Sequence, residues 1–274
     1  IIFGAAAALF VPSFPPFPDP RDAPGPWELV SELTVIVALF GTGLRIDEMR
    51  IRLARPGALL PVALLGLATG LLAGAVIVVF RLVVEGLQDD ILPGSGSEAF
   101  ESLDWPLRIA LPIMAAIALA IMFRFFSRGL HVLGVARIME RLAFHQGRVG
   151  WREFFLQFVG AALAIIGGHS VGREGPHVFL GAASGSIIGR HLSLPHNATR
   201  TLVGCGVAAG IAASFNTPLA GVVFALEVVM MEYTLASFIP IILAAVSATA
   251  LSIMVFGDAP AFSVPAVSIG HLNE

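Results

Sequence analysis

The chain has 274 residues, of which 57% are hydrophobic and 13% charged, and its mean hydropathy is +0.88. A soluble domain carries about 25% charged residues, so this composition excludes an ordinary soluble domain. The formal net charge of −3 at pH 7, in a chain whose basic residues are all arginine, indicates no nucleic-acid partner.

Apolar runs recur along the chain, and the longest are long enough to cross a bilayer as helices of about 20 residues. The main runs are 59–80, 107–123, 154–167, 202–213, 219–231 and 238–256. The short alternating segments that a membrane barrel needs are not found. The sequence therefore predicts an all-α, multi-pass integral membrane protein.

Two further apolar segments, 1–10 and 29–42, lead the chain, and the proline-dense stretch "VPSFPPFPDPRDAPGPW" separates them. That stretch cannot be helical, because proline breaks a helix interior. The first segment is too short to span, starts with Ile1 and has no basic n-region. We therefore expect a chain that is cut at its front, rather than one led by a signal peptide.

Charge predicts the orientation of the helices. Arginines cluster in 45–56 and again in 124–152, whereas the connector between the two clusters is rich in acids. Arginine-rich loops stay on the cytoplasmic side. We therefore predict that 45–56 and 127–152 lie inside and 87–106 outside, so that a tilted helix 57–86 crosses outward and a helix 107–126 returns.

The stretch "GREGP", Gly172 to Pro176, places charges within a very apolar region. Proline is favoured at the first position of a helix, so we predict that a helix begins at Pro176 with Gly175 at its cap. The free N–H groups of a first turn attract anions. The carboxylate of Glu174 could occupy such a site as a removable plug, or it could simply pair with Arg173 in a structural turn.

Three glycines, Gly181, Gly185 and Gly189, follow at four-residue spacing, which predicts close packing against another helix. A second proline-started helix is predicted at Pro218, with Asn216 and Thr217 as cap candidates. Glu227 lies further along it. Both a proton relay and a structural, hydrogen-bonded acid remain open for Glu227.

Enzyme motifs are not found: the sequence has no Walker lysine, no His-Glu zinc motif and no nucleophile elbow. His169 and Ser170 are adjacent but lack an acid partner, so polar packing is their expected role. We predict no enzyme activity, no metal site and no cofactor.

The "GREGP" motif and the downstream stretch "AAGIAASFNTPLAGVVFALE", 208–227, resemble the CLC family of chloride channels and chloride/proton exchangers. The resemblance covers roughly 57–258, and "LLAGAVIVVFRLVVEGLQ" looks like the family's first membrane helix. It implies tilted and broken helices that form the first half of an inverted-repeat pore domain. It also implies transport of chloride or a similar small anion, which some members couple to proton transport. The protein would act as a homodimer in a lipid bilayer, here a bacterial inner membrane.

The resemblance also implies site residues. Glu174 would be the external gate and the entry point for protons, while the backbone of Gly172, Arg173, Gly175 and Pro176 would bind the anion. Gly134 matches a glycine of the family's first signature and would be a further anion-binding residue. At the neighbouring positions, however, Leu133 and Ala136 replace the family's anion-binding serine and its proline.

Other departures concern the mechanism and the extent of the chain. Val228 replaces the glutamate that many exchangers carry after the position of Glu227, which favours passive conduction. The third signature and the pore tyrosine of the second half are not found, because Tyr233 lies in another context. We therefore expect only the first half of the pore domain.

The segment 27–47 resembles instead an early helix of cation/proton antiporters. We therefore divide the chain into a leading hydrophobic hairpin with an arginine-rich link, 1–56, and an amino-terminal CLC half, 57–274. Two alternatives to anion transport stay open, a cation/proton antiporter fragment and a non-conducting membrane module.

Overall fold

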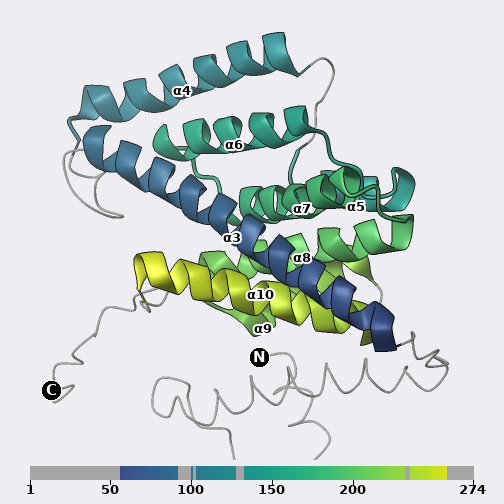
Figure 1. Ribbon diagram of the computed structural model, residues 1–274. Helices are drawn as coiled ribbons and strands as arrows, with labels where there is room; N and C mark the ends of the chain where they lie inside the picture. The colour runs from purple at the N-terminus through teal and green to yellow at the C-terminus, as the bar shows by residue number, and fades with distance from the viewer. Residues whose placement is uncertain (1–55, 92–99, 101–102, 128–132, 232–234, 258–274) are drawn as a thin grey trace, which may run out of the picture. The chain divides into compact units, whose positions relative to one another are not determined.

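The computed structural model describes residues 56–91, 100, 103–127, 133–231 and 235–257, all within the unit Leu53–Glu274. Every regular element in these ranges is helical, which confirms the all-α prediction (Figure 1). The elements are α3 (Pro56–Ile91), α4 (Trp105–Phe126), α5 (Val135–Phe144), α6 (Trp151–Ile166), α7 (Glu174–His191), α8 (His196–Phe215), α9 (Pro218–Phe224), a π-helical turn η2 (Ala225–Met230) and α10 (Leu235–Phe256). The leading segment 1–55, with its antiporter-like part 27–47, lies outside the described residues, as does Tyr233.

Four of the described helices are long and apolar enough to cross a bilayer. They are Leu60–Ile91, Trp105–Phe126, His196–Phe215 and Ser237–Phe256. The first two correspond to the predicted helices 57–86 and 107–126, and α3 continues beyond the predicted end. The chain is therefore an integral membrane protein with several spans.

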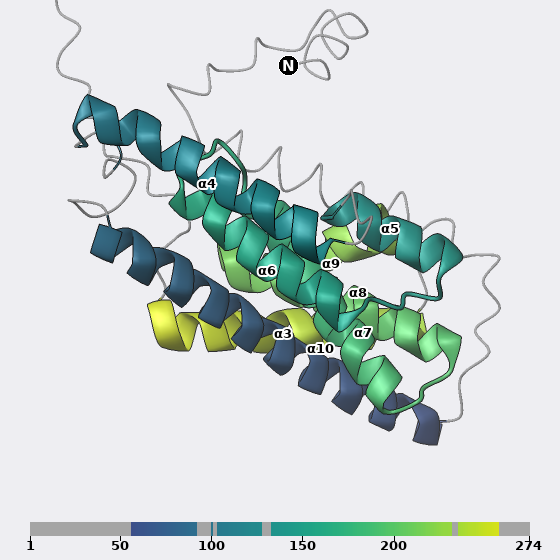
Figure 2. The same ribbon diagram turned by 90° about the horizontal axis from the view of Figure 1, so that it is seen from above.

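The helices form a stack, in which α4 contacts α6, α6 contacts α7, α7 contacts α8, and α8 contacts α10. The long helix α3 crosses this stack and packs on α7, α8 and α10 (Figures 1 and 2). Helices α7 and α8 hold most of the buried core, whereas α4 has no buried residue among those described. Because α7 is central, its amino-terminal end is positioned by neighbours on several sides.

Glycines bring α7 and α8 into backbone contact, as the four-residue spacing predicted. A Cβ atom added to Gly181 would lie 2.1 Å from the carbonyl oxygen of Gly206. One added to Gly185 would lie 2.0 Å from the carbonyl oxygen of Leu202. Only residues without a side chain allow this approach, so these glycines set the distance between the two helices.

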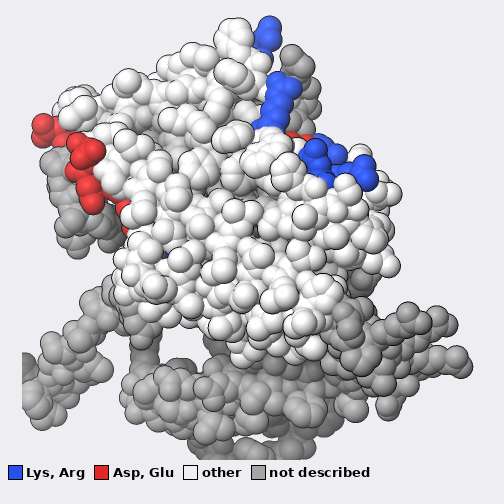
Figure 3. Space-filling model, in the orientation of Figure 1, with Lys and Arg blue, Asp and Glu red and all other residues white. Residues whose placement is uncertain are grey.

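The charged residues gather at opposite ends of the stack (Figure 3). Acidic side chains lie where α3 ends and α4 begins, and exposed arginines lie at the end of α4 and around α5 and α6. This separation agrees with the charge pattern used above to orient the helices. The cytoplasmic location of the arginine-rich end stays a prediction.

An ion-pair cluster joins α5 to α6 at the arginine-rich end, outside the four candidate spans. The buried carboxylate of Glu153 accepts hydrogen bonds from Arg137 at 2.8 Å and from Arg141 at 2.5 Å. Burial raises the pKa of Glu153, but the hydrogen bonds from the two arginines outweigh it and hold the pKa below its ordinary value. The carboxylate is therefore charged in the folded protein.

Replacing Glu153 with glutamine is expected to destabilise the protein at pH 7, because it removes the carboxylate that Arg137 and Arg141 share. Arg137 keeps its bond to Glu140, whereas Arg141 has no other described ion pair. Breaking a buried ion pair costs about 3–5 kcal/mol, and less is expected here because the arginines are partly exposed. A group with a lowered folded pKa contributes stability above its unfolded pKa and loses it as pH falls through the folded value. The difference in thermal midpoint between the two proteins should therefore shrink below pH 4.5, the ordinary value; a constant difference would contradict this account.

Candidate functional site

The "GREGP" motif forms the start of α7, but the helix begins earlier than predicted. Arg173 is the N-cap, and Glu174 is the first helical residue. The prediction of a start at Pro176 with Gly175 as cap is therefore wrong. Proline is tolerated here because the first-turn N–H groups have no partner within the helix, so Pro176 removes no hydrogen bond.

Backbone donors are free at this helix start. Among the described residues, none accepts a hydrogen bond from the backbone N–H groups of Gly172, Arg173, Glu174 or Gly175. The N-cap also has no side-chain cap. Free amides and the positive end of an 18-residue helix together favour an anion.

The Glu174 carboxylate lies beside Gly172, next to this helix start. Its side chain is exposed in the described unit, and it makes no hydrogen bond or ion pair with a described residue. A Cβ atom added to Gly172 would lie 2.0 Å from Oε2 of Glu174, so the carboxylate folds back over this glycine. Gly172 therefore leaves the space that the carboxylate occupies.

Arg173 does not pair with Glu174, so the pairing alternative is contradicted. Its guanidinium donates to Oε1 of Glu85 on α3 at 3.4 Å. Glu85 also accepts from Arg81 at 3.3 Å, and the Arg81 guanidinium lies 3.8 Å from the ring centre of Phe256. Arg173 is thus held toward α3, and Glu174 has no counter-ion among the described residues.

A buried polar pair lies one turn further along α7, and sequence reasoning missed it. His177 is 2% exposed, and its Nδ1 lies 2.5 Å from the hydroxyl of Ser214 on α8. Because Ser214 donates its only proton to the carbonyl of Gly210 at 2.6 Å, Nδ1 of His177 is the donor in this pair. Nε2 is then an acceptor, and it has no partner among the described residues.

Gly134, the residue matched to the first signature, is the N-cap of α5. Its φ of +92° suits only glycine, so another residue here would be strained. The side chain of Leu133 packs against the hydrophobic core and offers no hydrogen-bond donor. Helix α5 contacts α7.

The second proline-started helix is confirmed, with Pro218 in the first turn of α9 and Thr217 as its N-cap. Neither cap candidate makes a side-chain cap: Thr217 has no cap hydrogen bond, and Asn216 is the left-handed C-cap of α8. Glu227 lies in the π-helical turn after α9 and makes no hydrogen bond or ion pair with the described residues. The structural alternative, in which a bond holds Glu227, therefore finds no support in this part of the chain.

The arrangement can bind an anion at one helix end and can exchange it for a carboxylate. Among the described residues, no group of three or more histidine, cysteine, aspartate and glutamate side chains could hold a metal ion. His169 packs as expected, with Nδ1 3.2 Å from the carbonyl of Ala164.

Comparison with known proteins places this helix arrangement in a family. Residues 113–273, more than half of the chain, match the family model described as voltage gated chloride channel. A putative chloride channel protein, ClcB-like, of Ralstonia nicotianae is 31% identical over 60% of this chain and 39% of its own length. The H⁺/Cl⁻ exchange transporter ClcA of Salmonella paratyphi B is 28% identical over 84% of this chain and 49% of its own length.

Solved structures agree with this result. The crystal structure of a CLC-type fluoride/proton antiporter is 29% identical, with a TM-score of 0.60 over 74% of this chain and 49% of that chain. The fold is also shared with a slow cyanobacterial Cl⁻/H⁺ antiporter, at 21% identity and a TM-score of 0.59 over 77% of this chain and 50% of that chain. The chain spans about half the length of the relatives it matches, or less. It belongs to the voltage-gated chloride channel, or CLC, family.

Proposed function

We propose that the protein moves chloride or a similar small anion across the membrane, with Glu174 as the gate. One observation supports this most: the Glu174 carboxylate lies beside Gly172 at the start of α7, where backbone amides are free, and no described residue is its counter-ion. A carboxylate and a small anion compete for the same donors, so the site opens when the carboxylate leaves. The names of the relatives, chloride channel and H⁺/Cl⁻ exchanger, support the same class of function.

The neighbouring residues have supporting roles in this proposal. The backbone of Gly172, Arg173 and Gly175 would contact the anion, and Pro176, which has no N–H group, would fix the backbone of the first turn. Gly134 would position the start of α5 on the inner side. Glu227, without a described partner, is available as a proton relay.

The mode of transport and the preferred ion are separate questions. Val228, at the position where many exchangers carry a glutamate, favours passive conduction over exchange. Leu133 lacks the hydroxyl that would bind chloride at the family's serine position. Fluoride is therefore a second candidate ion, which the similarity to a CLC-type fluoride/proton antiporter at 29% identity supports.

The remaining assignments follow from the family. We propose that 57–274 is the amino-terminal half of a CLC pore domain, and that 1–56 is a leading hairpin with an arginine-rich link. The working unit is a homodimer in a bacterial inner membrane, in which helices after Leu202 contribute to the dimer contact.

Flux from liposomes tests the proposal. The full chain in proteoliposomes is expected to release chloride or fluoride, measured with ion-selective electrodes, and a pH electrode reports whether protons move in exchange. Sodium- or lithium-dependent pH changes without anion flux would instead indicate a cation/proton antiporter. No flux of any kind from folded, dimeric protein would indicate a non-conducting membrane module.

A further inference from the structure

A second polar site lies at the opposite end of α7 from Glu174. A cavity of about 340 Å³ opens between the connection from α5 to α6 and the turn from α7 to α8. Its volume falls at the small end of the range for ligand pockets, roughly 300–1,000 Å³. Nothing in the proposed anion gate uses this cavity.

The cavity has a fixed frame. The backbone N–H of Val149 donates to the buried hydroxyl of Ser186 on α7 at 2.8 Å. The carbonyl of Val149 accepts from Nη1 of Arg190 at 2.9 Å. These two bonds fix the α5–α6 connection to α7, so the lining residues keep their positions before a ligand arrives.

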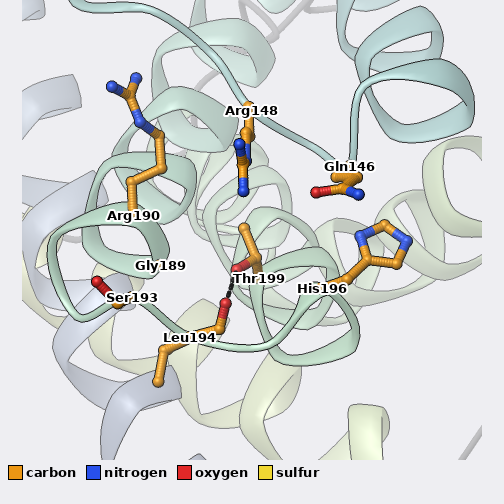
Figure 4. Close-up of a pocket in the computed structure, with 8 residues that line it drawn as sticks. All are labelled: Gln146, Arg148, Gly189, Arg190, Ser193, Leu194, His196 and Thr199. Atoms are coloured by element: carbon orange, nitrogen blue, oxygen red, sulfur yellow. Dashed lines mark hydrogen bonds between the residues drawn. The ribbon is translucent and has the colours of Figure 1, made fainter.

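The lining is cationic. Arg148 directs its guanidinium into the hollow toward Thr199, with Gln146 and His196 on one side and Ser193 on the other (Figure 4). The Arg148 guanidinium has no hydrogen bond or ion pair with a described residue, while Arg190 adds a second charge at the rim. None of the described residues that line the cavity carries a carboxylate, and the nearby Glu153 is already bound by Arg137 and Arg141.

The backbone at the cavity comprises the carbonyl end of α7, whose dipole disfavours an anion, and the start of α8, whose N–H groups favour one. At the end of α7, the carbonyls of Ile188, Gly189 and Arg190 already accept from the N–H groups of the following turn. At the start of α8, Pro195 is the N-cap and provides no side-chain cap. This helix end adds to the attraction for an anion that the arginines create.

We propose that this cavity binds a phosphate-bearing anion. A guanidinium offers a planar fork of N–H donors that matches the oxygens of a phosphate, and the hydroxyl of Ser193 and the amide of Gln146 can bond further oxygens. The cavity lies at the start of α8, which is a candidate span, so the phosphate can come from a phospholipid headgroup or from solution.

Ligand-dependent thermal stability of the full chain in detergent tests the proposal. The probes are dioctanoyl-phosphatidylglycerol and inorganic phosphate, and the readout is the midpoint of unfolding from tryptophan fluorescence. At least one probe is expected to raise the midpoint of unfolding, and this rise should reach a plateau as the probe concentration increases. Saturation by the lipid alone identifies a headgroup site, and saturation by inorganic phosphate identifies a site for free phosphate.

Replacing Arg148 with glutamine is expected to raise the half-saturating concentration about tenfold, because a charge-assisted hydrogen bond is lost. Arg152→Gln is the matched control, because it removes an exposed arginine of the same end that does not line the cavity. It should leave saturation unchanged. If Arg148→Gln does not fold, His196→Ala replaces it and should also weaken binding. The proposal would be overturned if the cavity variant and the control raised the half-saturating concentration equally, or if neither probe had a saturable effect on the midpoint.

Discussion

Replacing Glu174 with glutamine is expected to increase anion flux. Glutamine has nearly the same shape, but it cannot carry the charge that competes with the anion at the positive end of α7. A charge at a helix end contributes about 0.3–1 kcal/mol, and up to about 2 kcal/mol in partly buried sites, so removing this competitor should raise flux roughly 2–30-fold. Anion efflux from liposomes at pH 7 measures the effect.

The control for Glu174→Gln is Asp89→Asn. Asp89 is an exposed acid near the end of α3, at the same acidic end of the stack, and its side chain makes no hydrogen bond or ion pair with a described residue. This variant removes the same charge at a residue outside the start of α7, so flux should stay unchanged. If Glu174→Gln leaves flux as it is, or if the two variants act alike, Glu174 is not the gate.

The helices could be predicted from the sequence because each apolar run is long and its ends carry clear signals. The runs 59–80 and 107–123 became α3 and α4, and Pro218 began α9 as its missing N–H suggests. The predicted start of α7 lies two residues after the observed start, because a proline is accepted anywhere in a first turn and does not by itself mark the first helical residue. The π-helical turn that holds Glu227 has no signal in the sequence that we recognised.

The position of the candidate site could be predicted from the sequence, but the residues that contact its side chains could not. "GREGP" pointed to the right helix end, whereas the ion pair of Arg173 with Glu85 joins residues 88 positions apart. The spacing of Arg81 and Glu85, four residues apart on one helix, was the available hint of a charged group on α3. The contact between His177 and Ser214 depends on the α7–α8 packing, so it becomes visible only after the fold is known.

Replacing Gly185 with alanine is expected to prevent normal packing of α7 on α8. The new Cβ would lie 2.0 Å from the carbonyl oxygen of Leu202 and 2.6 Å from its carbonyl carbon, and these backbone atoms cannot rotate away. Overpacking in a core costs about 1–3 kcal/mol, and the upper part of this range or beyond is expected where both sides are backbone. A fall in the thermal midpoint and in the yield of monodisperse protein measures the effect.

Gly86→Ala is the matched control for this packing, because it makes the same change in a membrane helix where no atom lies within 4 Å of the added Cβ. Alanine is favoured over glycine in a helix interior by about 1 kcal/mol, so this variant should be as stable as the parent or slightly more stable. The two substitutions therefore have opposite expected signs. A Gly185→Ala protein as stable as Gly86→Ala would mean that α7 and α8 are further apart than described, and the position of the Glu174 site on α7 would then need revision as well.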